Sequence, residues 1–150
     1  MNPPTAPASL GQRLLQLGIL LFLLGLLTGF AVPLLANPRM GLSSHLEGIL
    51  NGIFLVLLGL LWPRLRLSRF WLITIFWLAL YGSFANWGAT LLAAVWGAGS
   101  SMPLAGGGLK GTPTQEAIID FLLYSLSFAM VAVCVIVLWG LKTDIRKATY

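Results

Sequence analysis

Charged side chains are scarce in this sequence. Only 9% of its 150 residues are charged and 58% are hydrophobic, with four acidic residues against nine basic ones. So few polar groups cannot cover the surface of a water-soluble globule. The composition therefore excludes an ordinary soluble domain and indicates a protein that faces the hydrocarbon of a lipid bilayer.

Cysteine and histidine each occur once, as Cys134 and His45. A single cysteine excludes a disulfide framework and a cysteine-based metal site within the chain, and no Cys-x-x-Cys-His motif for covalent haem attachment is present. Alternating polar and apolar residues are also lacking in the long hydrophobic runs, which argues against a membrane β-barrel.

Four apolar stretches are long enough to cross a bilayer, because a spanning helix needs roughly 20 residues for a core of about 30 Å. We expect residues 1–150 to form one all-α domain, a four-helix membrane bundle. The first stretch is longer than the apolar core of a signal peptide, so we expect it to be retained. The predicted spans are 14–35, 42–62, 70–96 and 116–141.

The basic residues predict an orientation. Seven lie on one side of the predicted spans and two on the other, and cytoplasmic segments are enriched in Lys and Arg. We therefore expect a multi-pass protein of the bacterial inner membrane with both termini in the cytoplasm, and no nucleic-acid partner. The seven are Arg13, Arg64, Arg66, Arg69, Lys142, Arg146 and Lys147, and the two are Arg39 and Lys110.

Two loops are predicted on the outer side. Residues 36–41 contain Asn37-Pro38, a turn signal that makes the first two spans an antiparallel hairpin. Residues 97–113 hold six glycines and two prolines. We expect this second loop to be either a flexible lid or a disordered surface connection.

Polar side chains of three spans fall at one depth, in the outer half of the membrane. A buried polar group must find a partner or it destabilises the bundle, so this layer is the predicted location of the functional site. Its members are His45 and Glu47 in the second span, Ser83, Asn86 and Thr90 in the third, and Glu116 and Asp120 in the fourth.

His45 shares one stripe of its helix with Gly48 and Gly52. An imidazole beside a smooth glycine surface is suited to haem b, with His45 as axial ligand of the iron and the two glycines against the ring. Two alternatives stay open at this point. His45 can be a hydrogen-bonded structural residue, and the glycines can be a small-residue contact between helices.

Glu47 and Asn51 lie on another face of the same helix, turned by more than about 100° from His45. If His45 and Asn51 serve one site, they come from different subunits around a shared ligand. In the fourth span, Glu116, Asp120 and Tyr124 form an i, i+4, i+8 stripe that suits a proton donor or, alternatively, interhelical hydrogen bonds.

The run from Asn37 to Gly48, followed by Asn51-Gly52, closely resembles bacterial hydroxylaminobenzene mutase, as does the four-span layout. More distantly, His45 with Asn51 six residues on, and Asn86-x-Gly88, resemble membrane-bound styrene oxide isomerase. The second family forms trimers with haem b between four-helix subunits. The resemblance therefore implies a homotrimer, His45 as the iron ligand and Asn51 beside the substrate.

The resemblance to the mutase implies an isomerase that converts an aryl hydroxylamine into an ortho-aminophenol, with haem iron as Lewis acid. The small apolar substrate would enter from the bilayer. We expect Asn51 and Asn86 to orient it and Glu47 or Asp120 to carry protons. Aromatic side chains that suit the cationic ring of the transition state are Trp87 and Tyr124.

Three alternatives remain. A styrene-oxide-isomerase-like conversion of an epoxide to an aldehyde would need the tyrosine of that family, where this sequence has the shorter Thr90. A non-enzymatic b-type haem protein would need a second axial ligand, and Met40 is the nearest one. A small transporter or structural membrane subunit would hold no cofactor.

Overall fold

The computed structural model describes residues 6–142, with side chains from 9 to 141, and this part of the chain contains helices and no strand. Its four long helices are each long and apolar enough to cross a membrane, which confirms the predicted all-α four-helix membrane fold. They are α1 (Ala6–Ala31), α2 (Pro38–Leu61), α3 (Arg69–Trp96) and α5 (Pro113–Lys142), joined by the short helices η1 (Val32–Leu34), η2 (Trp62–Arg64) and α4 (Pro103–Gly106).

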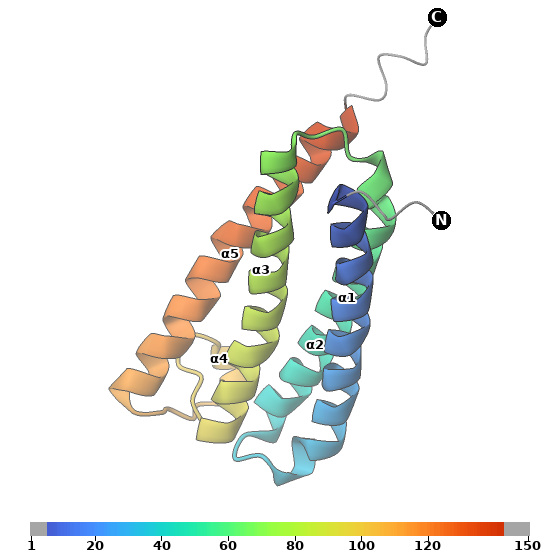
Figure 1. Ribbon diagram of the computed structural model, residues 1–150. Coiled ribbons are helices and arrows are strands. Elements are labelled where there is room, and N and C mark those ends of the chain that lie inside the picture. The colour runs from blue at the N-terminus through green and yellow to red at the C-terminus, as the bar shows by residue number, and fades with distance from the viewer. Residues whose placement is uncertain (1–5, 143–150) are drawn as a thin grey trace, which may run out of the picture.

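The long helices pack mainly against their neighbours in the sequence (Figure 1). Helix α1 lies along α2, α2 along α3, and α3 along α5, with a smaller contact between α1 and α3. The central helices are accordingly better covered. Of the most apolar 18-residue stretch of each helix, 39% is buried in α2 and in α3, against 22% in α1 and 17% in α5. The outer faces of α1 and α5 are thus left for lipid or another protein.

Helices α1 and α2 touch backbone to backbone at their glycines. A Cβ added to Gly48 would lie 2.5 Å from the Cα of Gly25, and one added to Gly52 would lie 2.6 Å from the backbone nitrogen of Phe22. Such close approach is how small residues join helices in a membrane. The prediction that Gly48 and Gly52 lie against a haem is therefore corrected, because α1 already covers both glycines.

Asn37 joins three segments that meet at the end of the bundle opposite the start of α1. Its side-chain oxygen caps α2 by accepting from the backbone N–H groups of Arg39 at 3.1 Å and Met40 at 3.3 Å. Its amide nitrogen donates to the carbonyl of Gly106 in α4 at 3.0 Å, and its backbone N–H donates to that of Ala94 in α3 at 2.9 Å. The turn signal Asn37-Pro38 is therefore also the anchor of the second outer loop.

Glu116 anchors the same loop from the other side. Its carboxylate accepts from the backbone N–H groups of Gly99 and Ser100, both at 3.1 Å, and of Gly111 at 2.7 Å, and from the Ser100 hydroxyl at 2.6 Å. Residues 97–113 thus have a defined structure that includes α4, which differs from the expected flexible lid or disordered connection. The glycine content of the loop did not indicate that the Glu116 carboxylate accepts hydrogen bonds from its backbone amides.

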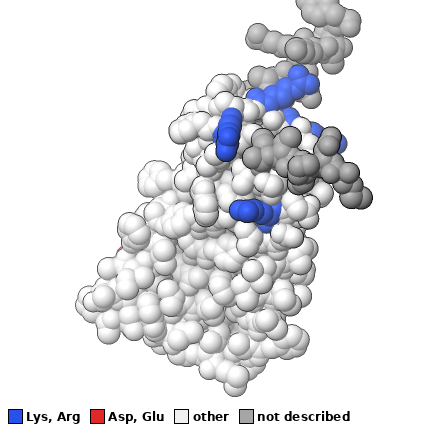
Figure 2. All heavy atoms as spheres, in the orientation of Figure 1, with Lys and Arg blue, Asp and Glu red and all other residues white. Residues whose placement is uncertain are grey.

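Basic side chains gather at the end of the molecule where α1 begins (Figure 2). Arg64, Arg66 and Arg69 are exposed there, whereas Arg39 and Lys110 belong to the opposite end. This distribution agrees with the predicted grouping of charge. Of the other residues in that grouping, Arg146 and Lys147 lie outside the described residues, as does the side chain of Lys142.

We expect Gly48→Ala to lower the free energy of unfolding in detergent by about 1–3 kcal/mol, because the new methyl group meets the backbone of α1 at Gly25 as well as the ring of Trp87. Gly88→Ala is the matched control, since nothing lies within 4 Å of a Cβ there and alanine favours a helix. Equal stability of the two variants would contradict the glycine contact.

Glu116→Ala should release the outer loop, because three backbone amides and a hydroxyl lose their acceptor. The exposed Lys110 lies in this loop, so trypsin cleavage after it should become about tenfold faster. Ser127→Ala, an exposed change in the same helix, should leave the rate unchanged. Identical cleavage of all three proteins would show that the loop does not depend on the carboxylate.

Candidate functional site

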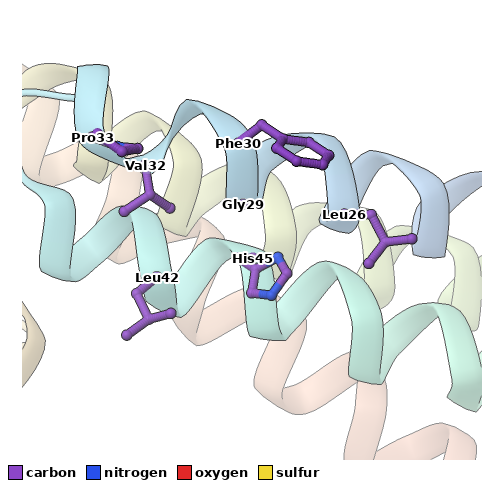
Figure 3. A pocket seen from close by; sticks show the side chains of 7 residues that line it. All are labelled: Leu26, Gly29, Phe30, Val32, Pro33, Leu42 and His45. Carbon is purple, nitrogen blue, oxygen red and sulfur yellow. The ribbon is translucent and has the colours of Figure 1, made fainter.

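His45 points from α2 towards α1 (Figure 3). Its Nδ1 lies 2.8 Å from the backbone carbonyl oxygen of Gly25. A carbonyl only accepts hydrogen bonds, so Nδ1 carries a proton and donates, and Nε2 is the ring nitrogen that this bond leaves available. The contact between the two helices thereby sets the tautomer as well as the direction of the imidazole.

An apolar groove of about 470 Å³ opens beside His45 between α1 and α2. Gly29 is the closest part of its wall, because a Cβ added there would lie 2.6 Å from the Nδ1 of His45. Every other lining residue is apolar, so the imidazole is the polar group that the groove offers. The lining residues are Leu26, Gly29, Phe30, Val32, Pro33, Leu42 and His45 (Figure 3).

The hydrogen bond to Gly25 fits the structural histidine left open above, and it also fits a histidine that binds haem. Ligating histidines usually donate their other ring N–H to a carbonyl or carboxylate, as His45 does to Gly25. Within the described part of the chain, no three His, Cys, Asp or Glu side chains converge on one point. A porphyrin brings four nitrogen ligands of its own, so one imidazole in an apolar groove suits haem b.

A second polar cluster lies on the α3 side of α2. The Oε2 of Glu47 accepts from the Nδ2 of Asn51 at 3.0 Å and from the Nδ2 of Asn86 in α3 at 2.6 Å. Asn51 also donates to the backbone carbonyl of Glu47 at 2.9 Å, and its side chain is buried with 8% exposed. The structure thus joins three of the predicted site residues, which we call the Glu47 cluster.

His45 and the Glu47 cluster face different neighbours, as the helical angles predict. The imidazole is held by α1, while the amide of Asn86 in α3 reaches Glu47. The chain therefore presents its histidine and its carboxamides in different directions.

Trp87 lies at the junction of three helices. Its Nε1 donates to the hydroxyl of Thr28 in α1 at 3.1 Å, and its backbone carbonyl accepts from the hydroxyl of Ser44 in α2 at 3.1 Å. Its ring comes within 2.9 Å of a Cβ added to Gly48. The sequence predicted that Trp87 lies beside the substrate. Thr28 and Ser44 were not among the predicted site residues, but their hydrogen bonds to Trp87 connect α1 and α2 to α3.

The predicted residues of the fourth span do not join the Glu47 cluster. Asp120 accepts a hydrogen bond from the hydroxyl of Ser101 in the outer loop. Tyr124 is 65% exposed on the surface of α5. In α3, the hydroxyl of Thr90 bonds to the carbonyls of its own helix, at Asn86 and Trp87. Of the i, i+4, i+8 stripe, Glu116 and Asp120 therefore bond to the loop of residues 97–113, and Tyr124 lies on the surface.

Comparisons with known proteins agree over most of the chain. Hydroxylaminobenzene mutase HabB of Ectopseudomonas oleovorans is 58% identical over 144 residues, which are 95% of this chain and 88% of HabB. Hydroxylaminobenzene mutase HabA of the same organism is 50% identical over 125 residues, 83% of this chain and 93% of HabA. No solved structure matches.

Both relatives are named as mutases, and a mutase is an isomerase, so the predicted enzyme class is confirmed. This finding goes against the alternatives of a non-enzymatic haem protein and of a transporter or structural subunit. The sequence model of styrene oxide isomerase matches residues 10–142. The chain is thus a multi-pass membrane isomerase that belongs to the styrene oxide isomerase family.

Proposed function

We propose that this protein is a hydroxylaminobenzene mutase that moves the hydroxyl group of an aryl hydroxylamine from nitrogen to the ortho carbon of the ring. The names and identities of HabB and HabA support this reaction. The observation that carries the mechanism is the hydrogen bond from His45 to Gly25, which leaves Nε2 as a ligand atom in an apolar groove. We assign haem b to that groove, with His45 as its axial ligand.

When bound, haem supplies a Lewis acid for the oxygen of the substrate. The Glu47 cluster supplies the proton chemistry. The rearrangement breaks the N–O bond, forms a C–O bond and moves one proton from the ortho carbon to nitrogen, so no oxidant or reductant is needed. All described hydrogen bonds to the Glu47 side chain end on Oε2, which leaves Oε1 to accept this proton and return it.

Asn51 and Asn86 hold the Glu47 carboxylate from two helices, so its direction is set before substrate binds. We assign them to the orientation of the substrate nitrogen as well, since each amide keeps an oxygen that can accept from N–H. The bilayer around the site limits attack by bulk water on the ring. It also supplies a small apolar aromatic substrate from the side.

The different directions of His45 and the Glu47 cluster support a shared site between subunits. In a closed ring, the histidine groove of one copy faces the carboxamides of the next. We therefore propose a homotrimer with haem b between neighbouring subunits. The grouping of exposed arginines supports an inner-membrane protein with both termini in the cytoplasm.

The epoxide-opening alternative finds less support. The hydroxyl of Thr90 is 2.9 Å from the carbonyl of Asn86 and 3.0 Å from that of Trp87, and the residue is 4% exposed. A hydroxyl bonded in this way to its own helix is not placed to hold an epoxide. The mutase reaction needs no hydroxyl at this position.

His45→Ala should abolish the Soret absorbance of the purified protein and lower turnover of hydroxylaminobenzene at least about 100-fold, because the ligand atom is lost. The protein should still insert in the membrane, since His45 is only half-buried. Ser43→Ala, two residues away, removes only an exposed hydrogen bond to the carbonyl of Arg39, so it is the control and should keep both signals. Full turnover by the His45 variant would exclude the assigned haem site.

Glu47→Gln should keep the Soret band and lower kcat about 10²–10⁴-fold, because an amide keeps the contacts to Asn51 and Asn86 yet carries no proton. Asp120→Asn makes the same chemical change at a carboxylate that bonds to the outer loop, so kcat should be unchanged. Formation of 2-aminophenol gives both rates. A larger loss in the Asp120 variant would transfer the proton role to that residue.

A further inference from the structure

We propose that a groove between α2 and α5 binds one anionic phospholipid, with an acyl chain in the groove and the phosphate at the arginines that follow α2. This inference does not depend on the mutase reaction. The groove, which we call the α2–α5 groove, is apolar and has a volume of about 200 Å³. Its lining residues are Phe54, Leu57, Leu58 and Leu61 of α2 and Val133, Cys134 and Val137 of α5.

The α2–α5 groove has the dimensions of a single alkyl chain. Helices α2 and α5 both run towards the end of the molecule where α1 begins, so the groove between them lies along the direction of lipid chains (Figure 1). From Phe54 to Leu61 its α2 wall is roughly 10 Å long. A volume of about 200 Å³ over this length suits one chain, and it is too narrow for a helix about 10–12 Å wide.

The segment after η2 crosses the end of the groove. The backbone N–H of Arg66 donates to the carbonyl of Gly140 in α5 at 3.3 Å, and the Leu67 side chain lies 2.8 Å from a Cβ added to Gly140. The chain therefore passes from the end of α2 to the end of α5, about one turn beyond Val137. A lipid with a chain in the groove has its headgroup at this crossing, because the phosphate of a phospholipid lies beyond its chains.

This crossing presents its arginines to the outside. Its backbone is extended at Leu65, and in an extended chain successive side chains point to opposite sides. Leu65 is buried and Leu67 is half-buried, whereas Arg64 and Arg66 are exposed. The exposed Arg69 follows as the first residue of α3. Three guanidinium groups thus lie close together along the chain at the end of the groove.

Charge complementarity selects an anionic headgroup. The acidic side chains among the described residues are Glu47, Glu116 and Asp120, and all three belong to the first half of α2 or α5, away from the arginines. Guanidinium groups bind phosphate, and each basic residue beside a spanning helix raises the affinity for an anionic lipid surface about fivefold. A zwitterionic headgroup lacks the net charge that gives this attraction.

Aromatic rings mark the depth of this end in the bilayer. The ring of Trp71 packs edge-on against that of Trp139 in α5, with 5.8 Å between ring centres, and against that of Phe70 at 5.4 Å. Trp139 and Phe70 are exposed. Aromatic side chains are enriched where a membrane protein crosses the headgroup layer. The arginines therefore lie at the depth of the phosphates, and the groove at the depth of the chains.

The first test compares dioleoylphosphatidylglycerol with dioleoylphosphatidylcholine, each added to full-length protein in detergent. The anionic lipid should raise Tm by at least about 4 °C more than the zwitterionic one. Arg64→Gln, Arg66→Gln and Arg69→Gln together should remove this difference. Arg39→Gln with Lys110→Gln, which changes exposed basic residues of the opposite end, is the control and should preserve it.

Cys134 tests the groove itself, because it is exposed and is the single cysteine of the chain. Its reaction with N-ethylmaleimide should be at least about threefold slower with phosphatidylglycerol than with phosphatidylcholine, and about 0.5 M NaCl should cancel the difference. Inorganic phosphate has no chain and should give no protection. Cys134→Trp fills the groove and should remove the Tm difference, whereas Val135→Trp, at an exposed position of α5, should keep it.

Equal effects of the two lipids on Tm and on alkylation would overturn the proposal. The salt comparison uses the unaltered protein, so it decides the question even if the arginine variant does not fold. A Tm difference that survives in Cys134→Trp would show that the headgroup binds without the groove and would overturn the assignment of the acyl chain. Alkylation that slows with rising protein concentration in the absence of lipid would assign the groove to a second copy of the chain instead.

Discussion

The contact between the backbones of α1 and α2 is the constraint on which the site depends. Gly25 and Gly48 approach so closely that no side chain fits between them, and in a bilayer such packing replaces the hydrophobic force that joins helices in water. The carbonyl of the same Gly25 accepts the hydrogen bond from His45. The packing of α1 against α2 therefore also orients the imidazole of His45, because α1 provides the carbonyl that accepts its hydrogen bond.

Two faces of helix α2 carry functional groups of different kinds. The α1 face carries an imidazole in an apolar groove, which suits a metal macrocycle, while the α3 face carries a carboxylate between two amides. The helices pack in a row, so α1 covers one of these faces and α3 covers the other. In the homotrimer proposed above, a site shared between copies brings the imidazole and the carboxylate to one substrate.

Residues 97–113 show how a glycine-rich loop acquires a defined structure. Gly97 and Gly107 have φ angles of 64° and 63°, which other residues rarely adopt, and each ends a helix there. Glu116 then accepts from the loop amides, and Asn37 connects the loop to α2. The acids of α5 therefore act on the loop, which explains their distance from the proposed proton path.

Hydropathy and helical period were enough to predict the four spans, the grouping of the arginines and the different directions of His45 and Glu47, because each is a local property of one segment. The partners of Gly48, Asp120 and Glu116 could not be predicted in this way. The sequence pattern of a glycine stripe is identical whether a macrocycle or a helix covers it. An acidic residue likewise has the same pattern around it whether it contacts a substrate or a loop. Only the packing of one helix against another decides between them, since that sets which atoms meet.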